Sequence, residues 1–464
     1  MGKLFTLNLN FHPNKLFGVQ LLRWLVSFSL IFYLMFSPST FAATDLSNQV
    51  PVAPETDTLT MNNSDSDDEV FAIAMDGMEL SQHVKKTAGN ENYLEIWIDA
   101  DFSHNADSAQ AIQAGIITAL SNVNYQVGGT AIKIIGADHR GNPIRSKRTM
   151  KSYLKSDKAI AILGGLHSGP YIKNREFINA NEVLLLLPWS AGGMITRYPS
   201  IMNWVFRLSV DDNKAGQFLA EQAVNKKCKT VDLVLENTGW GRGNQKNIKK
   251  SQLSKYTTHF FDWGVGGEEL DDLVESIMYN DADCMIFVGN TNEGASVFGK
   301  LFDAGFAKPI ISHWGITSGN LEEKLGQFKL SSLDVEFIQT CFSFMDKSNS
   351  EHDVLDKAIN VVPRYSKAED IVSPVGFIHS YDIGLLLIEA LSQVNPDSSI
   401  TEQRRQLRHA LENLNSPIPG LVKTYQNPFS VWAETNPDAH EALDQNNLCM
   451  AQYDDSGSIV LVDE

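Results

Sequence analysis

The stretch Ala159-Ile-Ala-Ile-Leu-Gly-Gly-Leu-His-Ser-Gly169 decides the fold class of this chain. Its first part, 159–165, is a short apolar run that ends in glycine, which predicts a buried strand. The second part, Leu166-His-Ser-Gly169, predicts the opening of a helix. A buried strand that turns directly into a helix is the βα unit from which parallel sheets are built.

Similar units lie on both sides of this stretch. Apolar runs alternate with amphipathic segments from Tyr93 onward, and they predict two successive doubly wound series. In the first series we expect strands at 93–99, 131–138, 159–165, 183–190 and 204–210, with helices at 107–123 and 213–225. In the second series we expect strands at 231–236, 259–265, 284–288, 309–313 and 336–344, with helices at 268–278 and 293–304. The predicted fold class is α/β, with two doubly wound parallel-sheet lobes.

The last part of the chain is more helical. Helices are expected at 374–394 and 401–414, followed by a turn that contains Pro417, Pro419 and Gly420. A hairpin at 448–462, turning at 454–457, is predicted to end the fold.

The N-terminal segment resembles an export signal. Lys3, Lys15 and Arg23 precede an apolar run, 24–36, which is too short to span a bilayer of about 30 Å comfortably. We expect a signal peptide over 1–42, cleaved after Ala42, and therefore a periplasmic protein; an uncleaved membrane anchor is the alternative.

Acidic residues exceed basic ones, and the formal net charge is −18. This balance excludes nucleic acid as an expected partner, because a phosphate backbone is bound by clustered Lys and Arg. Nine of the acidic residues lie between Thr44 and Val84, where there is no Lys or Arg. The stretch 43–91 is therefore expected to be a disordered acidic tether.

The four cysteines are Cys228, Cys284, Cys341 and Cys449. None forms a CxxC pair, so neither zinc nor a redox motif is indicated. Export permits disulfides. Cys228 pairs with Cys284 if both lie at the start of neighbouring strands, which leaves Cys341 for Cys449; the other connectivities and free buried thiols remain open.

Several ordered motifs resemble the type I periplasmic binding proteins, the leucine/isoleucine/valine-binding receptors of ABC transporters. The resemblance covers about 93–462. It rests on the following segments, in order: Gly136-Ala-Asp-His-Arg-Gly-Asn-Pro143, Leu163-Gly-Gly-Leu-His-Ser-Gly169, Leu187-Pro-Trp-Ser-Ala191, Phe206-Arg-Leu-Ser-Val-Asp-Asp212, Gly239-Trp-Gly-Arg-Gly243 and Ser380-Tyr-Asp-Ile-Gly-Leu-Leu386. The segment Phe206–Asp212 matches the family's first crossing between lobes, and Gly239–Gly243 looks like its aromatic-Gly-x-Gly turn.

The resemblance implies two lobes joined by three hinge strands. Lobe one would contain 92–209 and 340–424, and lobe two 210–339 and 425–464. A small molecule would bind between the lobes, because open α/β sheets bind ligands beyond the carboxyl ends of their strands. The implied partner is the membrane permease of an ABC importer.

Residues at the predicted strand ends form the candidate binding site. The opening of a helix at Ser168 offers backbone N–H groups and a hydroxyl for a carboxylate, which is also the role the resemblance implies. The other candidates are strand-end residues of the two lobes: Ser103, His167, Trp189, Ser190, Ala191, Trp240, Asn290 and Trp314.

Two departures from the family pattern concern the ligand. Ala191 stands where a Thr hydroxyl is usual, and Asn290 and Trp314 occupy the positions of the aromatic and acidic contacts to an ammonium group. Since a buried ammonium without a counter-charge is unfavourable, we expect a flat aromatic acid, an amide or an amino-acid-like solute rather than an ordinary branched-chain amino acid.

No motif predicts an enzyme. Asn244 replaces the third glycine of a dinucleotide fingerprint, and Ala295 stands where a P-loop requires Lys. The eleven histidines show no ligand spacing for a metal. We therefore expect no catalytic residue, no metal and no cofactor. The alternative to a transport receptor is a ligand-sensing or cell-envelope regulatory protein on the same scaffold, for which a tether would serve as a spacer.

Overall fold

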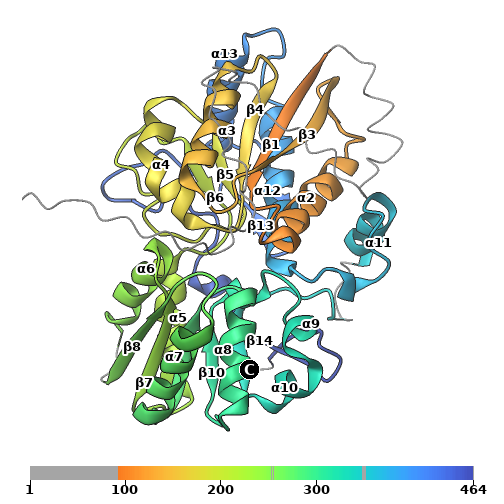
Figure 1. The fold of residues 1–464 in the computed structure, drawn as a ribbon. Helices are drawn as coiled ribbons and strands as arrows, with labels where there is room; N and C mark the ends of the chain where they lie inside the picture. Colours follow the sequence, from red (N-terminus) through yellow and green to blue (C-terminus); the bar gives the residue numbers. More distant parts are fainter. Residues whose placement is uncertain (1–91, 252, 254, 347–351, 463–464) are drawn as a thin grey trace, which may run out of the picture. The chain divides into compact units, whose positions relative to one another are not determined.

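The computed structural model describes residues 92–462, apart from 252, 254 and 347–351 (Figure 1). The predicted signal peptide over 1–42 and the predicted acidic tether over 43–91 lie outside the described residues.

The first sheet has six strands in the order β2-β3-β1-β4-β5-β6. Its pairs are parallel except β2–β3, as expected for βα units. The bounds of its strands are Tyr93–Ala100 (β1), Gln126–Val127 (β2), Thr130–Asp138 (β3), Ala159–Gly164 (β4), Leu185–Leu187 (β5) and Val205–Arg207 (β6). The helices that follow these strands are Ala106–Ser121 (α2), Pro143–Lys155 (α3) and Ser168–Ala180 (α4).

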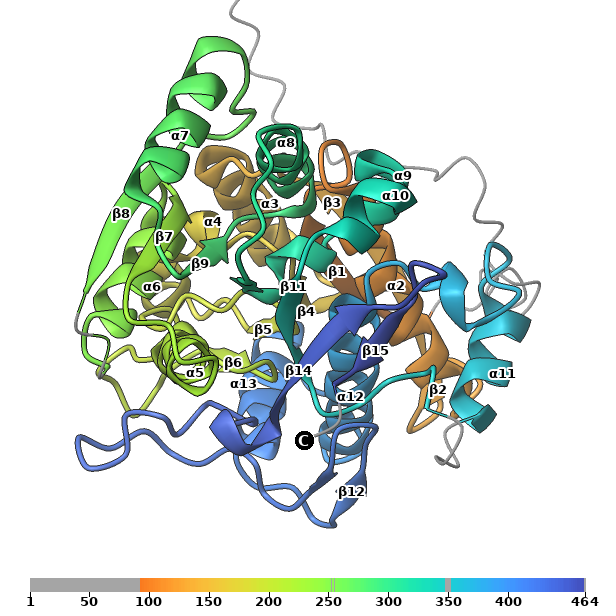
Figure 2. The same ribbon diagram turned by 90° about the horizontal axis from the view of Figure 1, so that it is seen from below.

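The second sheet has seven strands in the order β15-β14-β11-β10-β9-β7-β8. Its strands are Val231–Glu236 (β7), Tyr256–Phe261 (β8), Cys284–Val288 (β9), Ile310–Ser312 (β10), Val335–Thr340 (β11), Leu448–Tyr453 (β14) and Ile459–Leu461 (β15). Its helices are Asp212–Asn225 (α5), Gly239–Ile248 (α6), Gly267–Asn280 (α7), Thr291–Asp303 (α8), Leu321–Leu325 (α9) and Gln327–Ser332 (α10). β14 and β15 pair antiparallel, as the predicted hairpin does (Figure 2). The α/β class with two parallel-dominated sheets is confirmed.

The chain passes from one sheet to the other three times. It leaves the first sheet after β6 and leaves the second after β11, and it then forms His352–Val361 (α11), Pro374–Leu391 (α12) and Ile400–Leu411 (α13). α12 packs on α2, and α13 packs on β4 (Figure 1). After the short pair Ile418–Pro419 (β12) and Thr424–Tyr425 (β13), the chain returns to the second sheet as β14. The late helices therefore complete the layers around the first sheet.

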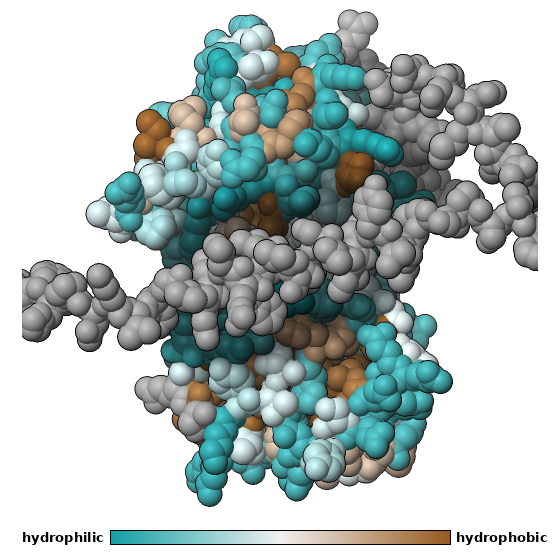
Figure 3. All heavy atoms as spheres, turned by 60° about the vertical axis from the view of Figure 1, so that its left-hand side comes forward, coloured by the Kyte–Doolittle hydropathy of each residue, from teal (hydrophilic) through white to brown (hydrophobic). Residues whose placement is uncertain are grey.

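α12 is long and apolar enough to cross a membrane by length and composition, but 78% of its apolar window is buried inside the protein. Its Asp382 carboxylate accepts hydrogen bonds from the Leu421 and Val422 backbone and from the Tyr425 hydroxyl. These contacts explain how a carboxylate is accommodated in a buried helix, and α12 is accordingly a core helix. The face drawn in Figure 3 shows mainly hydrophilic residues between scattered hydrophobic ones, as expected for an acidic protein in water.

The cysteines form two disulfides, in one of the connectivities that the sequence left open. Cys228, just after α5, joins Cys284 at the start of β9, and Cys341, just after β11, joins Cys449 in β14. The second bridge closes a sequence separation of 108 residues.

Two expectations about local structure were wrong. The segment that begins at Gly239 is not a turn but the helix α6, because the Thr238 side chain accepts a hydrogen bond from the Gly241 N–H and so begins a helix. The strand expected at 183–190 is only Leu185–Leu187, because Pro188 has no N–H to continue the ladder.

Candidate ligand-binding site

One cavity lies at the carboxyl ends of strands from both sheets. It has a volume of about 190 Å³, which is below the ~300–1,000 Å³ typical of drug-sized ligands and therefore favours a compact solute. Seven of the nine predicted site residues line it, and they come from loops that follow β4, β5, β7, β9 and β10: His167, Ser168, Trp189, Ala191, Trp240, Asn290 and Trp314.

The other two predicted residues, Ser103 and Ser190, are not among the lining residues. The Ser190 hydroxyl is fully buried and donates to the Gly165 carbonyl oxygen at 2.5 Å. The Ser103 hydroxyl is exposed and donates to Asp138 at 2.5 Å. Ser190 fixes the loop after β4 from behind, and both hydroxyls are occupied by protein acceptors.

The first wall of the cavity is the start of α4. His167 is its N-cap residue, and Ser168, Gly169 and Pro170 of the first turn line the cavity. The N–H groups of a first turn have no acceptor within the helix, and Pro170 contributes none. The Ser168 hydroxyl accepts a hydrogen bond from the Gly192 N–H at 3.0 Å, which ties this helix start to the loop after β5. A helix N-terminus with unpaired N–H groups stabilises a negatively charged ligand group.

His167 is held by a buried acid. Its Nε2 lies 3.1 Å from Asp101 Oδ2 and 3.2 Å from Asn105 Nδ2. Burial by itself raises the pKa of Asp101, but hydrogen bonds from His167, the His104 backbone and Asn105 outweigh it and hold that pKa below its ordinary value. Asp101 therefore remains charged and orients the imidazole at the cavity edge.

Trp189 lies behind this wall and is 1% exposed. Its six-membered ring packs on Gly376 of α12, where an added Cβ would come within 2.8 Å of the ring. The Trp189 Nε1 atom has no hydrogen-bond partner among the described residues. A buried N–H donor of a lining side chain thus has no partner among the described residues, which is uncommon in folded proteins.

The second wall contains Trp240, placed by the first turn of α6. Its Nε1 donates to Asp212 Oδ1 at 3.0 Å, and Asn244 Nδ2 donates to the same oxygen at 2.8 Å. Asp212 is the first residue of α5, immediately after the chain crosses from the first sheet. The crossing segment therefore positions the indole of Trp240.

Glu236 is a site residue that the sequence reasoning missed. It is the last residue of β7, it is 3% exposed, and its Oε2 accepts a hydrogen bond from Asn290 Nδ2 at 3.0 Å. Burial raises the pKa of Glu236, and the nearby His167 partly opposes this shift. The available signal was a carboxylate at the carboxyl end of a mostly apolar strand.

Trp263 was missed as well. It follows β8, is 45% exposed, and its ring lies against His167 with 4.7 Å between ring centroids. Gly141 lies so close to the same indole that a side chain there would collide with it. Trp263 therefore reaches from the second sheet's loops to those of the first and covers one side of the cavity.

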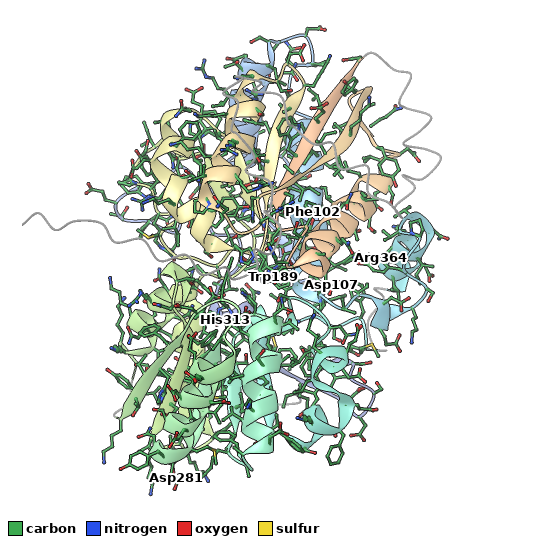
Figure 4. The ribbon with its side chains drawn as sticks, viewed as in Figure 1. Phe102, Asp107, Trp189, Asp281, His313 and Arg364 are labelled. Carbon is green, nitrogen blue, oxygen red and sulfur yellow. A yellow bond between two sulfur atoms is a disulfide. The ribbon has the colours of Figure 1, made fainter. Side chains whose placement is uncertain are left out.

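Trp314 completes the aromatic lining. His313, which precedes it, packs edge-on against both Trp240 and Trp314, with centroid distances of 5.1 and 5.3 Å. On its other side Trp314 contacts His379 of α12 at 5.8 Å. Figure 4 labels Trp189 and His313, which come from the ends of β5 and β10 on the two walls.

A buried ionic cluster lies where β6 passes into α5. The Arg207 guanidinium is fully buried, donates to the Gly192 carbonyl at 2.8 Å and lies 3.5 Å from Glu441. Arg197 pairs with both Asp211 and Asp438. Burial raises the pKa of Glu441 to about 7, although the arginines oppose that shift. The cluster ties a crossing segment to the chain that returns before β14.

No group of three His, Cys, Asp or Glu side chains that could hold a metal ion occurs within the described part of the chain. The lining of the cavity contains hydrogen-bonding groups, aromatic rings and one carboxylate, that of Glu236.

Two parallel-dominated sheets whose strand ends share one cavity are the architecture of the type I periplasmic solute-binding proteins. The periplasmic binding protein family profile matches residues 97–421, and the chain belongs to this family.

Among individual relatives, an amino acid binding protein of Pseudomonas aeruginosa is 23% identical over 228 residues, which are 48% of this chain and 60% of that protein. The chain thus matches less than two thirds of that relative's length.

Solved structures share the fold. The branched-chain amino acid binding protein LivJ of Streptococcus pneumoniae, in complex with isoleucine, is 16% identical with a TM-score of 0.64, covering 80% of this chain and 99% of that chain. A leucine-binding protein LivK of Thermotoga maritima gives 15% identity and a TM-score of 0.65, covering 80% and 98%. A solute-binding protein of R. palustris in complex with benzoate gives 17% identity and a TM-score of 0.64, covering 80% and 95%.

Proposed function

We propose that this protein is an exported receptor that closes two lobes on a small solute and delivers it to the permease of an ABC importer. The observation that carries the proposal is the cavity itself, whose lining comes from strand ends of both sheets. A ligand in such a cavity touches both walls at once, so it stabilises a closed form over an open one.

The lobes we propose are 92–209 with 340–424, and 210–339 with 425–464. Their three connections follow β6, β11 and β13. The signal peptide over 1–42 would bring the chain to the periplasm, in keeping with the family. The protein acts by binding alone, without catalysis.

The solute we propose is amino-acid-like, an amide or an aromatic acid. Its carboxylate or amide oxygen would accept from the first turn of α4, beside Ser168, and from Trp189 Nε1, which has no partner within the described part of the chain. Trp314 stands where the family has an acidic contact to the ligand's ammonium group. Glu236, which lines the same cavity, would supply that acidic group instead.

A ligand screen tests this function. Amino acids, aromatic acids, amides and polyamines are added to the full mature chain, and the free energy of unfolding is measured. A true ligand at a hundredfold excess over its Kd is expected to stabilise the protein by about 2.7 kcal/mol. Small-angle scattering should show a smaller radius of gyration on binding.

Ser168→Ala is expected to weaken acids more than neutral ligands. Ser103→Ala is the matched control, because the Ser103 hydroxyl is exposed and bonded to Asp138, away from the lining. A screen in which no solute stabilises or compacts the protein would refute the proposed function.

A sensory role is the second candidate, favoured by the nine acidic residues between Thr44 and Val84 that a simple receptor has no need for. Crosslinking in the native envelope distinguishes the two. A crosslink to a transporter permease supports import, and a crosslink to a kinase or cyclase supports sensing.

A further inference from the structure

Tryptophan is concentrated in the cavity. The chain has 8 tryptophans, and four of them line this one cavity: Trp189, Trp240, Trp263 and Trp314. The Trp240 N–H is already paired with Asp212, so this side chain offers the cavity an apolar ring and not a hydrogen-bond donor. Indole faces attract cations through the ring quadrupole, and they do so without requiring N–H groups on the cation.

The same lining is electrostatically one-sided. Glu236 is its one acidic residue, and neither Lys nor Arg occurs among the described residues that line the cavity. The hydrogen-bond donors to the Glu236 carboxylate are neutral: Asn290 Nδ2 at 3.0 Å and the side chains of Thr238 and Trp263. Among the described residues of this lining, His167 is the one side chain that can carry a positive charge, and it is paired with Asp101. A buried carboxylate is unfavourable without a cationic partner of its own, so a ligand that brings a positive charge gains most from this wall.

The chemistry of the cation follows from the available acceptors. A primary ammonium carries three N–H donors, and each needs an acceptor when it is buried. Glu236, Thr238 and Asn290 Oδ1, which has no partner among the described residues, are the acceptors of the second wall, and its other side chains are indoles. Methyl groups on nitrogen need no acceptor, and they spread the positive charge over a surface that packs against aromatic rings.

We propose that the solute carries an alkylated ammonium group, seated among these tryptophans with Glu236 as its counter-charge, and a carboxylate at the start of α4. The inference rests on the proposed binding function and specifies its ligand as a betaine-type zwitterion. Glu236 is then a specificity-determining residue, which selects for charge, while the tryptophans select for methylation.

Isothermal titration calorimetry on the full mature chain tests the proposal with a methylation series. The probes are glycine, N,N-dimethylglycine, glycine betaine and the longer γ-butyrobetaine. The isostere 3,3-dimethylbutanoate has the shape of glycine betaine, with an uncharged tert-butyl group in place of the trimethylammonium group, and is therefore a net anion. Affinity is expected to rise with each methylation step, and a betaine is expected to bind at least tenfold more tightly than the isostere.

Glu236→Gln separates charge from shape. This variant should bind the betaine and the isostere with nearly equal affinity, while its circular dichroism and melting temperature show that it is folded. Glu402→Gln, at an exposed position of α13, is the matched control and should keep the full preference. Trp240→Phe, which keeps an aromatic ring, should lose less betaine affinity than Trp240→Leu.

Affinity that falls with methylation, an isostere that binds as well as the betaine, or a Glu236→Gln variant that keeps the preference would each overturn the proposal. Binding of an ordinary amino acid, amide or aromatic acid with no binding of the betaines would overturn it too, but would leave the proposed function standing. Failure of every solute to bind would remove both.

Discussion

Replacing Asp212 with Ala is expected to loosen the wall that holds Trp240. Asp212 is 1% exposed, and its Oδ1 receives both the Trp240 N–H and the Asn244 amide. Without the carboxylate, the Trp240 donor is left buried and unpaired, which costs about 1–3 kcal/mol. Asn244 Nδ2 still donates to the Trp240 carbonyl oxygen at 3.2 Å, so the loss of its hydrogen bond to Asp212 lowers the stability by less. The free energy of unfolding should therefore fall by about 2–4 kcal/mol.

Guanidinium denaturation followed by circular dichroism measures this change, and a double-mutant cycle isolates the hydrogen bond. Trp240→Phe removes the donor from the other side, so in the Asp212→Ala background it should cost about 1–2 kcal/mol less than in the wild type. Asp356→Ala, at an exposed position of α11, should change stability by under about 0.5 kcal/mol. Additive effects of the two substitutions, or an Asp212→Ala variant as stable as the control, would refute the reasoning.

Two further predictions concern pH and the disulfides. Burial lowers the pKa of His379 to about 4, from 6.5, so the unfolded chain takes up a proton more readily than the folded one as the pH falls through this range. Wild-type stability should therefore drop by about 3 kcal/mol more than that of His379→Gln between pH 6.5 and 4, and parallel denaturation curves would contradict this. The double substitution Cys341→Ser/Cys449→Ser should lower the free energy of unfolding by about 4–5 kcal/mol on loop-closure grounds. The shorter 56-residue loop of Cys228–Cys284 should contribute about 0.6 kcal/mol less, and the reverse order would count against a loop-entropy origin.

The sheets were predictable because their strands are mostly apolar runs between turn residues. β7 and β9 begin and end where the sequence predicts them, since 231–236 lies between Thr230 and Asn237 and 284–288 lies between Asp283 and Gly289. The strand ends next to the crossings were less predictable. There Pro188 and the contacts of the connecting segments decide where pairing stops, and neither has a periodic signature.

The site was predictable as far as strand order brings loops together, and seven of nine residues do line one cavity. Ser190 was expected there because it follows a strand, but its hydroxyl turns back to the Gly165 carbonyl. The direction of a hydroxyl depends on where a neighbouring carbonyl points, which sequence spacing does not contain. Glu236 is the opposite case. As the last residue of β7 it was assigned to a strand, and yet its side chain lines the cavity.

Trp263 illustrates a further limit. It lies in the connection between β8 and α7, which are an edge strand and a helix of the second sheet's part of the chain. Its place against His167 follows from how two parts of the chain more than 90 residues apart meet, as the positions 167 and 263 show. Local pattern identifies the aromatic residue but not the surface it covers.

The bridge between Cys341 and Cys449 encloses α11, α12 and α13 in a covalent ring of chain. A protease that cuts this ring once releases nothing, because the two pieces remain joined through sulfur until a reductant is added. The C-terminal hairpin would then stay attached to the second sheet, and nicked and intact protein would migrate together on a non-reducing gel. In an oxidising compartment populated by proteases, such a chain survives single cuts to its most helical part as one particle.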